Sequence, residues 1–251
     1  MIGRAAVRIR CGSGRDPARE GLVLQELRST PMLTLRRAAG CIYLVSGAAT
    51  PVGGDDAVLD IDVAPGASLI IRSVASAVAR RGPADAVARL AVSARVGDGA
   101  TLVWDPEPAV AAAGCRMQME TRVEVGEGGT VWWRDELVLG RCGEPAGSWS
   151  SSLSVDRGSR AVLRQHLAVG PGAPGWDGPA VVGAARALGT VLVLGGAPVP
   201  TVVRCSAGTA TVMALAEPDA AVVSATATGH LALRRLLAEA GASPPGPVPK
   251  A

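Results

Sequence analysis

Polar and apolar residues alternate with a period of two along several stretches in the middle of the chain. The clearest stretches are 58–63, 115–125 and 150–155. A period of two is typical of strands that bury one face. In the second stretch it points Met117 and Met119 inward and leaves Gln118 and Glu120 for water. The pattern therefore predicts half-buried β-strands.

A repeated octet separates these stretches. It has an apolar first residue, a glycine at the fourth position and alternation afterwards, and it occurs at 63–70, 96–103, 125–132 and 155–162. The first residues of the octets lie 33, 29 and 30 residues apart. A glycine in a tight turn can adopt a positive φ without steric cost. The repeat predicts β-hairpins that cannot cover their own apolar faces and stack on one another as an elongated, solenoid-like all-β body.

The C-terminal part changes period. Strand-like runs at 189–194, 199–205, 208–215 and 220–227 are followed by 229–240, where Leu233, Leu236 and Leu237 share one helical face. Thr228 is the expected N-cap of this helix and Gly241 its expected stop. We expect one all-β domain over 1–241 with this short helix at its end, and a disordered, proline-rich tail over 242–251.

Composition excludes several classes of protein. The 251 residues are 48% hydrophobic and carry a net charge of +3, which fits a globular chain and argues against disorder. The longest uncharged stretch, 187–203, is shorter than the roughly 20 residues of a membrane span. The N-terminus lacks a continuous apolar run, so no signal peptide is expected. The five cysteines form no CxxC pair, and a cytoplasmic protein is expected.

Histidine, serine and arginine patterns point to no common site. His166 and His230 are the only two histidines, too few and too far apart for a dedicated transition-metal centre. No serine lies in a nucleophile elbow. The arginine pairs at 36–37, 80–81 and 234–235 are interspersed with acids, which argues against nucleic-acid binding.

Carboxylates are the better candidates. Asp105 and Glu107 flank Pro106, and because proline follows each acid, this segment must leave the strand ladder. The two acids could be the general acid and base of a β-solenoid hydrolase, weak ligands of a cation, or solvated acids at a strand end. Asp55 and Asp56 follow two glycines and carry the same ambiguity.

Arg141 and Glu144 lie in a glycine-bounded loop that follows the apolar run 131–139. They are close enough in sequence to form a charge-assisted ion pair. The pair would fix the loop, and the favoured interpretation is a structural clamp. Direct contact with a ligand or partner is the alternative.

The order of several short motifs resembles the urease accessory protein family UreD, also called UreH. The motifs are Gly53-Gly54-Asp55, Pro65-Gly66-Ala67, Pro106-Glu107-Pro108, and Leu139-Gly140-Arg141 with Glu144 and Trp149. The match covers about 47–170 well. The family's Thr-rich stretch with a lysine is replaced here by 72–81, so no role of that lysine is carried over.

The resemblance implies a non-catalytic, elongated all-β scaffold with little helix. It implies as partners the UreF-type accessory protein, the UreG-type nickel-carrying GTPase and the urease apoprotein, so that nickel reaches the urease active site. An internal passage is the nickel route proposed for this family. We expect no tightly bound cofactor, but weak, transient nickel contacts at carboxylates such as Asp55 and Glu107, since two isolated histidines cannot supply an imidazole cluster.

Two other classes stay open beside the scaffold. The first is the β-solenoid hydrolase that uses Asp105 and Glu107. The second is a purely structural, self-assembling β-protein. Urease genes beside this one would favour the scaffold over both.

Overall fold

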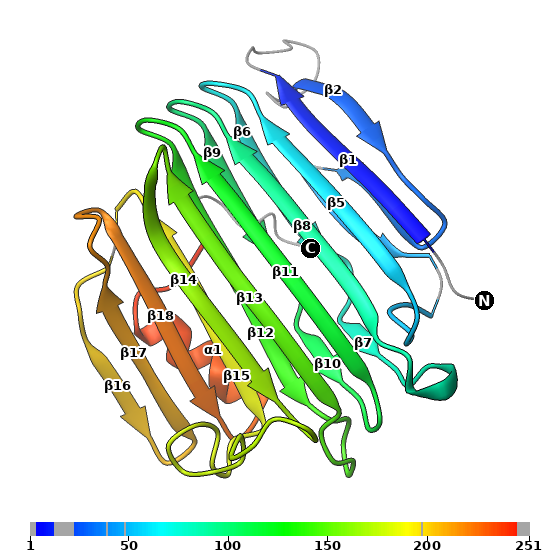
Figure 1. Ribbon diagram of the computed structural model, residues 1–251. Helices are drawn as coiled ribbons and strands as arrows, with labels where there is room; N and C mark the ends of the chain where they lie inside the picture. Colours follow the sequence, from blue (N-terminus) through cyan, green and yellow to red (C-terminus); the bar gives the residue numbers. More distant parts are fainter. Residues whose placement is uncertain (1–3, 13–22, 39, 48, 197, 245–251) are drawn as a thin grey trace.

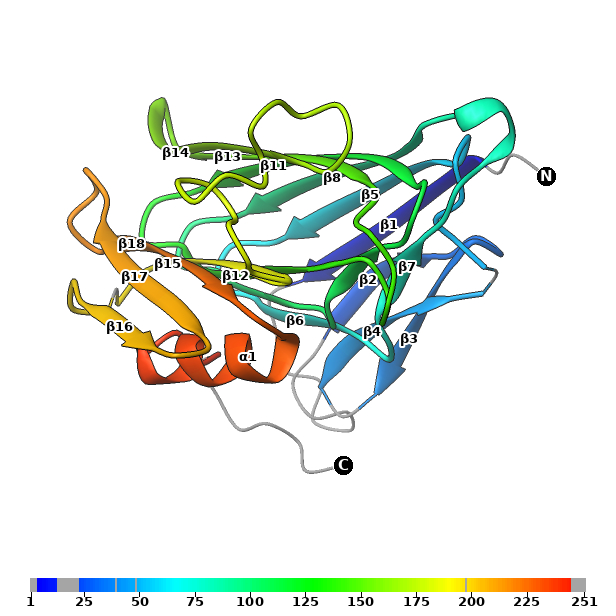
Figure 2. The same cartoon turned by 90° about the horizontal axis from the view of Figure 1, so that it is seen from below.

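Two β-sheets lie face to face, and one helix covers the outer face of the larger sheet (Figures 1 and 2). The structure is a computed structural model, and it describes residues 4–12, 23–38, 40–47, 49–196 and 198–244. The expected all-β class with a short C-terminal helix is confirmed.

The smaller sheet has seven strands, of which five neighbours run parallel to one another. In spatial order they are β14 (Arg160–Val169), β13 (Ser148–Arg157), β11 (Arg116–Val125), β8 (Ala88–Val96), β5 (Asp56–Val63), β1 (Arg4–Gly12) and β2 (Val23–Arg28). The edge strands β14 and β2 are antiparallel to their neighbours.

The larger sheet has eleven strands. Its main path runs β16 (Val202–Cys205), β17 (Gly208–Ala214), β18 (Ala220–Ala227), β15 (Ala187–Leu194), β12 (Thr130–Leu139), β9 (Thr101–Asp105), β6 (Ser68–Ser73), β4 (Cys41–Ser46) and β3 (Leu33–Ala38). The short strands β7 (Ala77–Ala79) and β10 (Ala109–Ala111) pair with each other, and β10 also pairs with β12. A short 3₁₀ turn, η1 (Pro83–Asp85), precedes β8.

The octet repeat marks the successive coils of this body, where a coil is one strand of the smaller sheet followed by a strand of the larger sheet. Three of the four octet turns are not hairpins. They carry the chain from one sheet to the other, from β5 to β6, from β8 to β9 and from β11 to β12, and only the fourth joins the antiparallel neighbours β13 and β14. The expected antiparallel pairing of the first three is therefore wrong. A turn glycine between two alternating runs shows that the chain reverses direction there. The same pattern is found whether the next strand pairs with the preceding strand in one sheet or lies opposite it in the other sheet.

The turns stack on one another as the coils do. The N–H of Gly66 donates to the Asp98 carbonyl at 2.9 Å, and the N–H of Gly99 donates to the Glu127 carbonyl at 2.8 Å. Both glycines have positive φ, 68° and 62°, as the octet requires.

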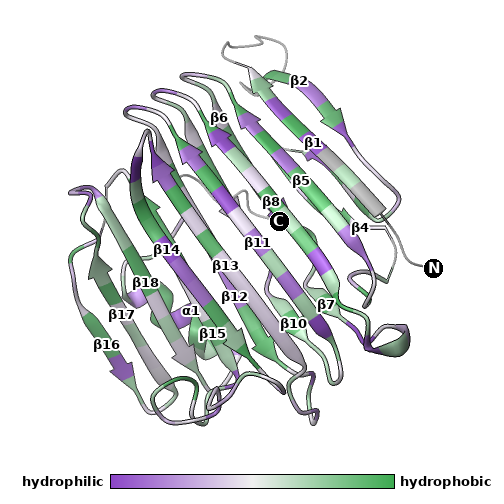
Figure 3. Ribbon diagram, viewed as in Figure 1, coloured by the Kyte–Doolittle hydropathy of each residue, from purple (hydrophilic) through white to green (hydrophobic). Residues whose placement is uncertain are grey.

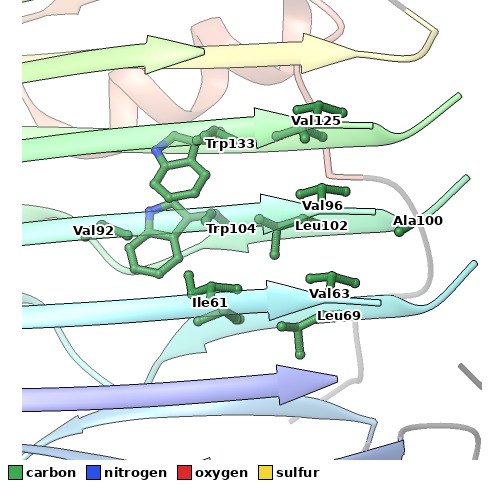
Figure 4. Close-up of a cluster of buried hydrophobic side chains, with 14 of the residues drawn as sticks. Ile61, Val63, Leu69, Val92, Val96, Ala100, Leu102, Trp104, Val125 and Trp133 are labelled. Carbon is green, nitrogen blue, oxygen red and sulfur yellow. The ribbon is translucent and has the colours of Figure 1, made fainter. Parts of the chain in front are cut away.

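Inward-facing side chains of successive coils form rows between the sheets. Val63, Val96 and Val125 occupy matching positions on β5, β8 and β11, and Leu69 and Leu102 face them from the other sheet (Figure 4). The strands alternate in hydropathy along their length (Figure 3). Full burial of each such side chain contributes roughly 1.5–3 kcal/mol, so this apolar end of the sandwich is the main stabilising core.

Helix α1 (His230–Glu239) forms where the period changes, and it buries Leu233, Leu236 and Leu237 against the eleven-stranded sheet. Its N-cap is Gly229 instead of the expected Thr228. The N–H of Thr228 donates to the Ala207 carbonyl at 2.8 Å and ties this residue to the sheet.

Beyond α1, Ala242 is buried in the same cluster. Residues 245–251 of the expected tail lie outside the described residues.

Candidate functional site: a carboxylate-lined cavity and its charged mouth

Two neighbouring coils of the eleven-stranded sheet are interrupted at the same level. Residues 74–76 separate β6 from β7, and residues 106–108 separate β9 from β10. We call these two segments the strand break. Pro106 and Pro108 cannot donate to a ladder, so the expectation that this segment leaves the ladder is confirmed.

The strand break leaves part of β12 without a neighbour on that side. β12 pairs with β9 as far as Trp133 and with β10 only from Leu137 onward. Arg134, Asp135 and Glu136 therefore pair only with β15 among the described strands. Side chains of this segment point alternately between the sheets and toward α1.

A cavity of about 280 Å³ lies between the two sheets beside the strand break. Its acidic lining residues are Asp55, Glu107, Asp135 and Glu136. Arg89 is the one basic residue of the lining in the described part of the chain. Residues 74–76 are exposed and also line the cavity, so the cavity opens to solvent there. It places carboxylates in the middle of an otherwise apolar sandwich.

Asp135 is held on the cavity wall by two tryptophans. Nε1 of Trp133 donates to its Oδ2 at 2.8 Å, and Nε1 of Trp104 donates to its Oδ1 at 3.2 Å. The two indole rings stack with centroids 4.6 Å apart (Figure 4). Burial raises the pKa of Asp135 to about 6, although the hydrogen bonds from Trp133 and Trp104 oppose this. At pH 7 Asp135 is therefore mostly ionised and contributes negative charge to the cavity wall.

A cluster of buried charged side chains lies on the opposite face of the same strands, beneath α1. Arg72 and Arg134 both pair with Asp105, with 3.3 Å between Nε of Arg72 and Oδ2 of Asp105. Burial raises the pKa of Asp105, and the charges of Arg134 and Arg72 oppose the rise. Burial likewise lowers the pKa of Arg134, and the charges of Glu136 and Asp105 oppose it. The ionised state of each side chain in this cluster thus depends on its oppositely charged partners.

Helix α1 completes this cluster from above. Nε of Arg234 lies 2.8 Å from Oε2 of Glu136, whose side chain is fully buried, and its Nη2 lies 3.3 Å from Oε2 of Glu107. Nε2 of His230 lies 3.1 Å from the same Oε2 of Glu136. Glu107 and Glu136 therefore link the mouth of the cavity to the helix.

The structure separates the two acids of the hydrolase hypothesis. Glu107 lines the cavity, whereas Asp105 is not part of the lining and is held by two arginines under α1. Since a general acid and base must face one substrate, the pair does not form a hydrolase site.

Asp55, the other expected nickel contact, lines the cavity and is 5% exposed. Its Oδ2 accepts from the N–H of Val52 at 2.9 Å. The structure therefore brings Asp55 and Glu107 to one cavity, at positions far apart in the sequence.

The ion pair expected between Arg141 and Glu144 forms, with Nε of Arg141 at 2.9 Å from Oε2 of Glu144. The hydrogen bond from Arg141 is the main cause that lowers the pKa of Glu144, and the same bond raises the pKa of Arg141. Glu144 also accepts from the N–H of Ala113, and its carbonyl accepts from Arg186. Both members lie outside the cavity lining, so the pair fastens a loop away from the cavity.

The sequence alone does not bring Asp135, Glu136, His230 and Arg234 together. The available signal was three consecutive charged residues, 134–136, inside a run that is otherwise strongly apolar. Contacts between residues nearly a hundred positions apart leave no local pattern.

Cysteines and metals add little to this site. All five cysteines are free, and burial raises the pKa of the Cys115 thiol to about 11. Among the described residues, no three His, Cys, Asp or Glu side chains are grouped closely enough to hold one metal ion. The described part of the chain also contains no helix that is both long and apolar enough to cross a membrane.

Comparison with known proteins gives the family. The model of the UreD urease accessory protein family matches residues 4–243. Urease accessory protein UreD of Streptomyces avermitilis is 40% identical over 244 residues, which cover 94% of this chain and 96% of that protein. Its counterpart in Streptomyces coelicolor is 40% identical over 248 residues, with 96% of both chains covered. Urease accessory protein UreD 3 of Streptomyces griseus is 38% identical over 254 residues, again with 96% of both chains covered. The chain therefore belongs to the UreD family of urease accessory proteins and has a role in urease maturation.

Proposed function

We propose that this chain is a non-catalytic scaffold that joins the urease apoprotein to UreF-type and UreG-type accessory proteins for nickel insertion. Family membership and the names of the relatives support a place in urease maturation. The separation of Asp105 from Glu107 supports a scaffold over a hydrolase. Free thiols throughout the chain are in keeping with assembly in the cytoplasm.

The observation that carries this proposal is the cavity in the middle of the body, which is lined by carboxylates and opens to solvent at residues 74–76. Nickel is the cargo in this scheme. Carboxylates alone hold Ni²⁺ less tightly than clusters of imidazole or thiolate groups, so Asp55 and Glu107 give contacts that the ion can leave. Asp135 adds negative charge to the cavity wall. An ion would be attracted into the body without being trapped.

The test uses the urease genes with their accessory genes in a host that lacks its own urease. Urease activity and nickel per purified urease are measured with and without this chain. We expect urease made without the chain to accumulate as nickel-free apoprotein. Full nickel loading without the chain would contradict the proposal, as would failure of the chain to co-purify with either the UreF-type protein or urease.

Two substitutions within the cavity and one outside it distinguish a role of the cavity in nickel transfer from the role of the chain as a scaffold. Asp55→Asn and Asp135→Asn should preserve co-purification with the partners but lower nickel per urease several-fold. Asp60→Asn is the matched control, because Asp60 lies on the exposed outer face of β5 and pairs with Arg8. Equal nickel loading in all three variants would remove the cavity from the nickel route.

A further inference from the structure

The guanidinium of Arg234 sits at the centre of three metal-binding groups. Its Nε lies 2.8 Å from Oε2 of Glu136 and 3.2 Å from Nε2 of His230, and its Nη2 lies 3.3 Å from Oε2 of Glu107. Three different segments of the chain supply these groups: α1, β12 and the strand break. The arginine thus takes the place that a cation shared by all three groups would occupy.

The donor set suits a divalent transition metal. One imidazole nitrogen and two carboxylates form a mixed N and O set of the kind that Ni²⁺, Zn²⁺ and Fe²⁺ accept. The two ring nitrogens of His230 are chemically distinct, and the one that faces Glu136 and Arg234 is Nε2.

One carboxylate oxygen of Glu136 has only a weak partner. The side chain is fully buried, and its Oε1 accepts no hydrogen bond and lies 4.0 Å from Nε of Arg134. A buried carboxylate oxygen without a hydrogen bond is costly. Such an oxygen gains more from a strong ligand than a solvated oxygen would.

We propose that Arg234 acts as an internal counter-cation that masks a divalent-metal site formed by Glu107, Glu136 and His230. In the arrangement described here the three groups surround the guanidinium and are not grouped closely enough for one ion. The metal site becomes complete when the guanidinium swings out and the three groups close on the ion.

The partial exposure of Arg234 and Glu107 makes this exchange feasible. The side chain of Arg234 is 30% exposed and that of Glu107 is 42% exposed, so their ion pair is screened by water and weak. Leu233 and Leu237 remain buried against the sheet and can hold α1 in place while the arginine moves. The guanidinium takes away one positive charge and the divalent ion brings two. The two negative charges of Glu107 and Glu136 are then neutralised.

The inference rests on the proposed function, because the metal would be the nickel cargo at the mouth of its cavity. A masked site would keep nickel affinity low at rest and would limit entry to ions that can displace Arg234. It assigns to α1 a part in cargo handling beyond covering the sheet.

The test is nickel titration of the full chain and its variants, with no urease present. Arg234→Met removes the charge and keeps much of the side-chain volume, and we expect it to bind Ni²⁺ at least tenfold more tightly than the wild type. The neighbouring Arg235→Met is the matched control, since Arg235 is exposed on α1, and its affinity should equal that of the wild type. Adding His230→Gln or Glu136→Gln to Arg234→Met should abolish the gain.

Nuclear magnetic resonance of the imidazole groups gives a second measurement. The chain has only two histidines, so paramagnetic Ni²⁺ should broaden the His230 signal of the Arg234→Met protein and leave His166 sharp. Circular dichroism checks folding, and Arg234→Gln, which keeps hydrogen-bonding capacity, replaces Arg234→Met if the latter does not fold.

Unchanged nickel affinity in a folded Arg234 variant would overturn the inference, as would a gain that persists without His230. Failure of the proposed function would appear elsewhere, in urease that loads nickel without this chain. The titration and the urease assay therefore fail independently.

Discussion

The two halves of the sandwich are built from the same coil but differ in what fills it. At the turn end, the rows of Val63, Val96 and Val125 meet Leu69 and Leu102, and the space between the sheets is closed (Figure 4). At the level of the strand break, prolines interrupt the ladder and acids replace aliphatic side chains, and a cavity opens. One repeat can therefore supply both a stable core and a functional space, depending on a few residues.

The polar half is stabilised by buried charges that neutralise one another. Removal of one charged side chain should therefore cause the largest loss of stability there. Arg134→Met leaves the buried carboxylates of Asp105 and Glu136 without a shared cation. We expect a loss of about 3–5 kcal/mol of unfolding free energy, measured by urea denaturation. Arg122→Met, which removes an exposed pair with Glu120, is the control and should change stability little. Similar losses in both variants would show that the cluster beneath α1 is not held by its charges.

The apolar half should respond to lost volume more strongly than the cavity half. Leu102→Ala at the closed end should cost roughly 2–5 kcal/mol, because Leu102 is fully buried among the valine rows. Met119→Ala at the cavity wall should cost less than half as much, since Met119 is only partly buried and already borders open space. Equal costs in urea denaturation would mean that the cavity is closed in solution.

Much of this division could be predicted from the sequence, and part of it could not. Alternation and glycine placement predicted the strand at 115–125, the apolar strand at 131–139 and the helix at 229–240 within one or two residues. The strand expected at 199–205 begins only at Val202, after Pro198 and Pro200, which cannot donate to a ladder.

The pairing of the strands and the composition of the charged cluster could not be predicted. Whether an octet turn leads to a neighbouring strand or to the opposite sheet depends on contacts between coils, which period-two alternation does not report. Similarly, His230 is isolated in the sequence, because its partner Glu136 lies on a strand almost a hundred residues earlier. The two residues meet only because α1 packs across β15, the neighbour of β12.

Asp135 should make the cavity half sensitive to pH. Its pKa is about 6 in the folded protein, above the value of about 3.9 for an ordinary aspartate. The folded state therefore holds the proton more tightly, and the stability from this group is complete below pH 4 and is lost as pH rises through 6. The difference corresponds to about 3 kcal/mol.

The check compares wild type with Asp135→Asn in urea denaturation at several pH values, so that other titrating groups cancel. Relative to the wild type, the variant should gain about 2–3 kcal/mol between pH 4 and pH 7, after a constant loss from its weaker bonding to Trp104 and Trp133. A pH-independent difference would show that Asp135 is well solvated in the folded state.

The smallest effect on stability is expected at Arg141 and Glu144, outside both halves. Arg141 is exposed and Glu144 is half-buried, and the pair fastens the 140–147 loop to Ala113 and Arg186. Exchanging either residue for Ala should leave a β-rich protein by circular dichroism. We expect weaker assembly with the UreF-type partner or apo-urease, and urease with less nickel.

The measurement is urease activity and metal content in cells that carry each variant, divided by the amount of soluble chain. Normal activity in both variants would show that the loop has no functional part. A fall that merely follows the amount of soluble protein would leave the pair as a structural clamp, because the ion pair would then act only through folding.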